Sequence, residues 1–219
     1  MYSNAEEILE LLEDFAEISV NENKKPFKAL ASHDRILSYL TKIISHQVDM
    51  RGKYETRVAL KHKGIRVLIN LSQDEGVIES LIVDHSIIKV VDGLICEHFS
   101  DDLNSAYESH YSEAPALQAN ETNLLHDTLL FTAILTSLQP ANIAFSTSNL
   151  AEHLWIISTN YHQQFSLEHW ILITWNYKNL ASSQFDVEFQ NIDPQMVFLS
   201  RYGETVIKLF TESQSENAT

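Results

Sequence analysis

Glycine and proline are scarce in this chain, which has five glycines and four prolines among 219 residues. Strand hairpins and tight turns depend on these residues, because glycine supplies positive φ and proline fixes φ. Their scarcity disfavours architectures with many strands. Hydrophobic residues make up 44% of the chain, a share typical of a globular protein rather than a disordered one. We therefore expect a helical protein with a substantial core.

The chain has a single cysteine, Cys96, so no internal disulfide can form and a disulfide-rich extracellular scaffold is disfavoured. The N-terminal segment is acidic and amphipathic, unlike a secretory or organellar leader. No apolar run approaches the roughly 18 residues that a membrane-spanning helix needs. These features predict an intracellular protein, in the nucleus or the cytoplasm, with no membrane partner.

Basic residues are half as numerous as acidic ones, 15 against 30, and they are unevenly distributed. Residues 1–23 contain seven acids and no base, residues 24–66 contain eleven bases and three acids, and residues 67–219 contain four bases and twenty acids. The net charge of −15 disfavours nucleic acid as a partner. The basic segment can still attract anions locally.

Apolar residues recur with helical spacing along the first third of the chain. A helix is predicted from Asn4 to Ile18, where Asn4 is an N-cap residue with Glu7 three positions later. The same periodicity predicts helices over residues 32–48 and 50–71. The chain therefore begins with an acidic amphipathic helix, followed by the helices of the basic segment.

Ser72 and Glu75 form a second capping box, which predicts a helix end at 70–72 and a new start directly afterwards. Residues 98–122 lose the periodicity and are rich in Ser, Asn, Asp and Glu, so we expect an acidic surface loop there. Further helices are predicted over residues 123–139, 149–160, 167–180 and 194–211.

The apolar pattern also repeats at long range. Offsets of 67 and then 42 residues bring apolar positions into register, as in the series Val83, Leu150 and Ile192. The two offsets differ by 25 residues, which is the length of the predicted loop, so one period of 42 with one insertion accounts for both. Armadillo and HEAT repeats have periods of about 40–47 residues.

Residues 65–95 contain V-L-I-N-L-S followed by I-E-S-L-I-V-D-H-S-I-I-K-V-V-D-G-L-I. This stretch resembles the third helix of an armadillo repeat running into the first two helices of the next. The resemblance implies an all-α fold, an armadillo-like superhelical stack of about three units with one acidic loop insertion. Residues 1–23 would be an acidic helix and linker, residues 24–211 one helical domain, and residues 212–219 a disordered tail.

The resemblance implies a non-enzymatic scaffold or adaptor that binds peptide segments of partner proteins within an intracellular complex. One helical unit cannot cover its own apolar face, so successive units stack and leave a curved surface free. No sequence signature of a phosphate-binding loop, a dinucleotide fold, a serine hydrolase or a zinc protease is present. We expect no catalytic residues, no metal and no cofactor.

Six basic residues between positions 51 and 66 are candidate partner-binding residues. Lys53, Arg57 and Lys61 are spaced i, i+4, i+8 and predict a cationic ridge on one helix. Such a ridge suits an acidic or phosphorylated peptide. The alternative is a solvated face partly neutralised by the acidic helix at 4–18. The other basic residues of this group are Arg51, Lys63 and Arg66.

Tryptophans gather in a second candidate region, at positions Trp155, Trp170 and Trp175. Tryptophan is enriched at the hot spots of protein interfaces, which favours a partner-binding role. The same residue suits a helical core, because each side chain buries a large area. Both interpretations stay open at this point.

Two alternatives belong to other functional classes. A small helical enzyme, metal-dependent or ribonuclease-type, would use Arg57 and His62, which have R-x4-H spacing, or the acidic, histidine-containing loop 97–113. Neither pattern is specific, because chance produces such a spacing and the loop lacks two histidines one helical turn apart. A homodimeric structural subunit would pack the acidic N-terminal helix on the cationic ridge of its twin.

Overall fold

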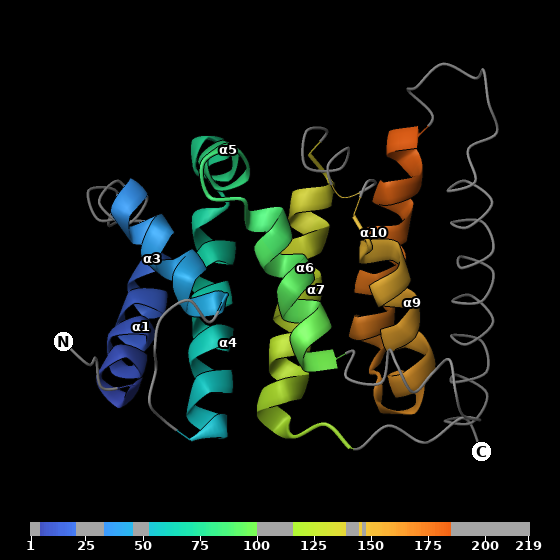
Figure 1. The fold of residues 1–219 in the computed structure, drawn as a ribbon, viewed down its shortest axis with the longest axis horizontal. Helices are drawn as coiled ribbons and strands as arrows, with labels where there is room; N and C mark the ends of the chain where they lie inside the picture. Colours follow the sequence, from blue (N-terminus) through green and yellow to red (C-terminus); the bar gives the residue numbers. More distant parts are fainter. Residues whose placement is uncertain are drawn as a thin grey trace. The chain divides into compact units, whose positions relative to one another are not determined.

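A computed structural model describes residues 5–20, 33–45, 53–99, 116–138, 145 and 148–184 (Figure 1). The regular elements in these residues are eight α-helices and one 3-10 turn, and no strand occurs among them. The predicted all-α class is confirmed for the residues that the structure describes. The chain divides into two compact units, one formed by residues 1–94 and 118–134 and the other by residues 95–117 and 135–219.

The first unit is built around α4, which spans Tyr54–Leu71 and buries most of its apolar residues. Both α1 and α3 pack against α4 (Figure 1). α1 contributes Ala5, Ile8 and Leu12, whose spacing of three and four residues places them on one face. The other helices that contribute residues to this unit have the bounds Ala5–Val20 (α1), Asp34–Ile44 (α3), Glu75–Val83 (α5), Ile87–Phe99 (α6) and Ala119–Thr136 (α7). The last residues of α6 and of α7 belong to the second unit.

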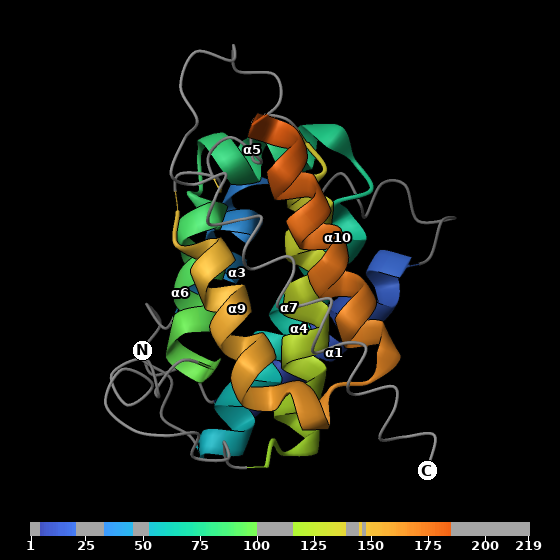
Figure 2. The ribbon, with the colours of Figure 1, turned by 90° about the vertical axis from the view of Figure 1, so that its right-hand side faces the viewer.

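The second unit contains α9 (Leu150–Tyr161), the 3-10 turn η1 (His162–Gln164) and α10 (Leu167–Gln184). α9 and α10 lie side by side (Figure 2). The hydroxyl of Tyr177 on α10 donates a hydrogen bond of 2.9 Å to the carbonyl of Ala151 on α9. This contact fixes which side of α10 faces α9.

A buried polar network joins the last turn of α7 to α10 within the second unit. The Asn179 side-chain amide donates to Thr136 Oγ1 at 3.0 Å, and that hydroxyl donates to Asn176 Oδ1 at 3.3 Å. The Asn176 amide in turn donates to the Leu172 carbonyl at 2.9 Å. Because buried polar groups are costly when unpaired, this chain of bonds specifies one rotation of α10.

The helix end predicted at 70–72 is confirmed, because α4 ends at Leu71. The capping box predicted there is wrong. Asp74 is the N-cap of α5, and its carboxylate accepts a bond of 2.9 Å from the Gly76 N–H. The Ser72 hydroxyl instead donates back to the Leu68 carbonyl at 2.6 Å. A serine at a helix C-terminus satisfies the preceding turn as readily as the following one.

The loop predicted over residues 98–122 is too long at both ends. α6 continues through Phe99, and α7 begins at Ala119. Residues 100–115 lie outside the described residues. The predicted helix over 194–211 and the predicted tail over 212–219 also lie outside them.

The repeat register fails at the pair Val83 and Leu150. Val83 is 72% exposed in the last turn of α5, whereas Leu150 is fully buried at the first position of α9. The offset of 67 residues therefore aligns the end of one helix with the start of another. The third position of that series, Ile192, lies outside the described residues.

α3 approaches α4 closely at Gly64. A Cβ atom on Gly64 would lie 3.2 Å from Ile44 Cγ1, whereas a Cβ atom on Gly93 of α6 would meet nothing within 4 Å. Both glycines are inside helices, where alanine is favoured by about 1 kcal/mol. Replacing either glycine by alanine therefore gains the same helix propensity, but only at Gly64 does the new methyl group meet a neighbouring side chain.

We expect Gly93→Ala to raise the free energy of unfolding by about 1 kcal/mol, and Gly64→Ala to give at least about 1 kcal/mol less than that. The loss at position 64 comes from displacing Ile44. Urea denaturation of the two variants and the parent measures both values. Equal stabilisation by the two substitutions would show that α3 does not pack tightly on α4.

Candidate functional site

The row of basic residues at Lys53, Arg57 and Lys61 does not form the exposed ridge that its spacing predicts. Lys53 is exposed at the N-cap of α4, Arg57 is partly buried, and Lys61 is fully buried. The reason is helical phase, since this row shares one side of α4 with the buried residues Leu60, Gly64, Ile65 and Leu68. The prediction that this row forms a continuous docking strip is wrong.

Lys63 and Arg66 lie on the other side of α4, and each contacts a carboxylate from a neighbouring helix of the same unit. Lys63 Nζ lies 3.3 Å from Glu13 on α1, and Arg66 Nε lies 3.6 Å from Asp127 on α7. Arg51, the remaining basic residue of the predicted group, lies outside the described residues. The acidic N-terminal helix thus packs on α4 of its own chain, as the neutralised-face alternative expects.

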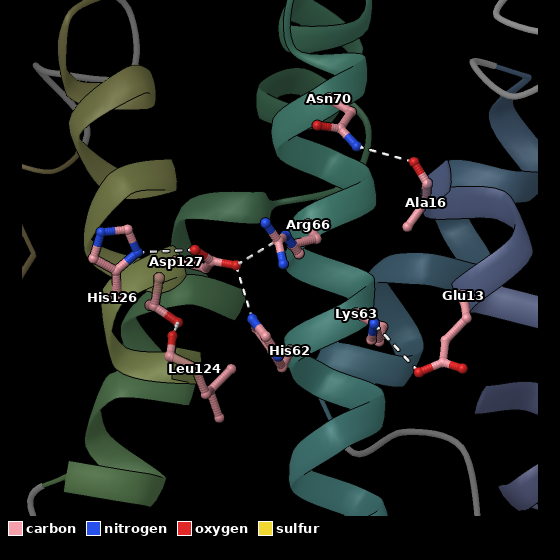
Figure 3. Close-up of polar contacts among 10 residues, drawn as sticks. Glu13, Ala16, His62, Lys63, Arg66, Asn70, Leu124, His126 and Asp127 are labelled. Atoms are coloured by element: carbon pink, nitrogen blue, oxygen red, sulfur yellow. Dashed lines mark hydrogen bonds and ion pairs between the residues drawn. The ribbon is translucent and has the colours of Figure 1, made fainter. Parts of the chain in front are cut away.

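Asp127 is the centre of the main polar cluster of the first unit (Figure 3). His62 Nε2 lies 2.8 Å from Asp127 Oδ2, and His126 Nδ1 lies 3.0 Å from Asp127 Oδ1. Arg66 adds an ion pair to Oδ2 from the turn after His62. Figure 3 shows both α4 side chains directed at the carboxylate on α7. We call these four residues the Asp127 cluster.

Asp127 is buried, and burial by itself raises the pKa of a carboxyl group. Hydrogen bonds to His62 and His126 and the positive charges of His62 and Arg66 act in the opposite direction and outweigh it. The pKa of Asp127 therefore lies below its ordinary value. The carboxylate is ionised at neutral pH and joins α4 to α7 across 65 residues of sequence.

His62, which the ribonuclease-type alternative pairs with Arg57, lies against Asp127. The ribonuclease-type pair of Arg57 and His62 does not converge. Both residues are on α4, and a separation of five positions turns them about 140° apart around the helix axis. The contacts of the Asp127 cluster are hydrogen bonds with the two histidines and an ion pair with Arg66.

The predicted acidic loop 97–113 lies almost entirely outside the described residues. Within the described part of the chain, no group of three or more His, Cys, Asp or Glu side chains is arranged to hold a metal ion. Cys96 is partly buried near the end of α6. Among the helices that the structure describes, none is long and apolar enough to cross a membrane.

The three tryptophans have three different environments. Trp170 is buried and meets the ring of Phe165 edge-on, with the ring centroids 5.4 Å apart. Trp155 is half-buried, whereas Trp175 is exposed to solvent. The core interpretation therefore holds for Trp170, and Trp175 is free to take the interface role.

α10 carries apolar side chains on both of its sides. Its inner side buries Trp170, Ile173, Tyr177 and Leu180. Its outer side exposes Leu167 (52%), Ile171 (54%) and Trp175 (43%), spaced four residues apart. Residues at i, i+4 and i+8 form one ridge along a helix. We call these three residues the outer stripe of α10.

Breaking the Asp127 cluster should destabilise the protein. We expect Asp127→Asn to lower the free energy of unfolding at pH 7 by about 2 kcal/mol, because charged hydrogen bonds contribute about 1.5–3 kcal/mol. The pKa of Asp127 is depressed in the folded state, so its contribution is present above the unfolded pKa of about 3.9. The contribution is lost as pH falls through the lower folded value, and the two proteins should then converge.

Urea denaturation at a series of pH values from 7 to 3 measures this difference. Asp84→Asn is the matched control, because Asp84 is exposed and accepts a single bond from the Ser80 hydroxyl. Equal stability of Asp127→Asn and the parent at pH 7 would contradict the assignment of Asp127 as the link between α4 and α7.

Comparison with known proteins finds no relative: no family model, no curated protein and no solved structure matches this chain. The similarity to armadillo repeats therefore stands on the pattern within this chain alone.

Proposed function

We propose that this chain is a non-enzymatic scaffold that binds partner proteins, with the outer stripe of α10 as its contact surface. The observation that carries the proposal is the exposure of Leu167, Ile171 and Trp175 in one ridge. Single exposed apolar residues are common, but a row of large ones with a tryptophan is typical of an interaction site. The fold leaves about half of each side chain in water.

The energy that such a stripe offers is suited to protein binding. Complete burial of a Leu or Ile side chain contributes about 1.5–3 kcal/mol, so the half that is still exposed offers about 1 kcal/mol per residue. A tryptophan at the centre of an interface can contribute about 2 kcal/mol or more. The stripe supplies apolar anchors, and the surrounding polar residues Glu168, Thr174 and Lys178 are exposed and form its rim.

The recurrence of the long helices supports an armadillo-like arrangement, which is part of the proposal. α4, α7 and α10 each have 18 residues. Offsets of 67 and 42 residues align four positions that are buried in all three helices. They are Leu60–Asp127–His169, Lys61–Thr128–Trp170, Gly64–Phe131–Ile173 and Leu68–Leu135–Tyr177.

The proposed partners are proteins of an intracellular complex, in the nucleus or the cytoplasm. Nucleic acid stays disfavoured, because the net charge of −15 repels a phosphate backbone. The contact surface proposed here is on α10 and replaces the basic row of α4 that the sequence suggested. Lys61, at the end of that row, is fully buried and cannot meet a peptide.

The double substitution Leu167→Asp with Ile171→Asp should abolish partner binding by the full chain. Two charges on the outer stripe oppose burial in any apolar interface, while exposed positions tolerate substitution within about 0.5 kcal/mol of stability. Affinity capture from cells followed by mass spectrometry measures binding, and circular dichroism checks that helicity is kept.

Val83→Asp is the control, because Val83 is an exposed apolar residue on α5, outside the outer stripe. We expect this control to keep its partners. If the double variant captures the same partners as the parent, the outer stripe is not the contact surface and the proposal fails.

A further inference from the structure

α3 carries basic side chains on the side that points away from α4. Arg35, Tyr39 and Lys42 are exposed there with the spacing i, i+4, i+7, so they lie within about 60° of one another around the helix axis. Within the described part of the chain, none of these three side chains has a hydrogen bond or an ion pair. Asp34, the acid of this helix, lies to one side of them, and its carboxylate is 3.0 Å from Nε2 of His85. We call Arg35, Tyr39 and Lys42 the basic face of α3.

α1 carries acidic side chains with the same spacing. Glu7, Leu11 and Asp14 are exposed at i, i+4, i+7, on the side that points away from the buried Leu12. Neither Glu7 nor Asp14 has an ion pair with another described residue. Leu11 is 68% exposed, and Tyr39, at the corresponding position of α3, is 42% exposed. We call Glu7, Leu11 and Asp14 the acidic face of α1.

The charges of the two faces match when the helices run antiparallel. Residues seven apart are separated by about 10.5 Å along a helix, on α1 as on α3. When Asp14 is level with Arg35, Glu7 is therefore level with Lys42. Within each pair the two side chains are offset by about 20° around the line of contact. Both attractive pairs thus form in one register, which is how complementary charges fix the register of an interface.

The residues between the charges distinguish the two possible directions. Leu11 comes three residues before Asp14, and Tyr39 comes four residues after Arg35, so their levels in the antiparallel pair differ by about 1.5 Å. Each of them is turned by about 40° to the same side of its own helix, and reversing one helix places both on one flank of the contact. A parallel pair would place them on opposite flanks. Leu11 therefore packs on the ring of Tyr39 only in the antiparallel pair.

We propose that the basic face of α3 binds the acidic face of α1 from a second copy of this chain, as an antiparallel helix pair. α1 of the same copy does not occupy the basic face, because α1 packs on α4, where its Glu13 contacts Lys63. The match of charge order and spacing between two faces of one chain selects a second copy as the occupant. The inference goes beyond the proposed function, since it uses helices of the first unit and not the outer stripe of α10.

The association is expected to be weak. A stable interface buries about 800 Å² on each partner, and one helix pair buries less than that. The net charge of −15 on each copy adds repulsion. In about 0.15 M salt the screening length is about 8 Å, so this long-range repulsion is largely screened while charges in contact still attract each other. Dissociation constants of about 10 micromolar or weaker follow from these limits.

Reversing the charges of the acidic face tests the pairing by sedimentation equilibrium of the full chain, from micromolar to several hundred micromolar. We expect Glu7→Lys with Asp14→Lys to weaken association at least tenfold, because both attractive pairs become repulsive. Replacing two acids by two bases changes the net charge from −15 to −11, which by itself favours association. A parent that is monomeric at every concentration, or a variant that associates like the parent, overturns the inference.

Glu55→Lys with Glu79→Lys is the matched control. Both are exposed acids outside the acidic face of α1, and the control changes the net charge by the same amount. We expect it to associate at least as strongly as the parent, and circular dichroism checks that every variant keeps its helicity. Equal weakening by the control and by the variant of the acidic face would overturn the inference.

Mixing two variants shows whether the two faces meet each other. Arg35→Glu with Lys42→Glu, which reverses the basic face, should also weaken association at least tenfold. A 1:1 mixture with the Glu7→Lys, Asp14→Lys variant should restore association, because α1 and α3 of one variant then carry charges opposite to those of α3 and α1 of the other. A mixture that associates no more strongly than either variant alone overturns the pairing.

Failure of this inference is distinguishable from failure of the proposed function. Leu167→Asp with Ile171→Asp, which disrupts the outer stripe of α10, should self-associate like the parent. Loss of self-association in this variant would show that copies meet through α10, and it would overturn the pairing of α1 with α3. A monomeric parent that still captures its cellular partners through the outer stripe would overturn the pairing and leave the proposed scaffold function standing.

Discussion

The first unit depends on one buried negative charge. Asp127 on α7 is removed from water, and its pKa stays below the ordinary value because hydrogen bonds with His62 and His126 and the charge of Arg66 outweigh the effect of burial. A buried carboxylate without such partners costs several kcal/mol, so α7 has a strong preference for one register against α4. The apolar residues of the two helices supply burial energy, but apolar contacts alone permit a slip of one turn. The buried carboxylate of Asp127 does not permit such a slip.

The same principle operates near the other end of α7. Thr136 is one of a series of buried threonines four residues apart, with Thr128 and Thr132, whose hydroxyls bond to the carbonyls one turn earlier. The Thr136 hydroxyl donates a hydrogen bond to Asn176 on α10. α7 thus carries Asp127 as the polar anchor of the first unit and Thr136 as the polar anchor of the second. Each anchor is specific because its partners belong to another helix.

Sequence periodicity predicted most helices within a few residues, because helix formation follows the local spacing of apolar residues. It could not predict the Asp127 cluster, whose members His62 and Asp127 are 65 residues apart. The burial of Lys61, in contrast, could have been predicted from the sequence. Charge spacing suggested a surface ridge, yet Leu60, Ile65 and Leu68 place Lys61 in the apolar arc of the same helix. Whether a basic residue on a helix is exposed thus depends on its angular position relative to the apolar residues of that helix.

α10 shows why the exposed side of a helix can be hard to predict from the sequence. Its tryptophans at 170 and 175 are five residues apart, which puts them about 140° apart around the axis, so a single packed face buries only one of them. Apolar residues on both sides hide which side is the core, and Tyr177 settles it by bonding to α9. The outer stripe is then a feature that folding does not require. Strong net negative charge opposes indiscriminate association of such a surface, so a lasting contact needs a partner whose charges and ridges fit it.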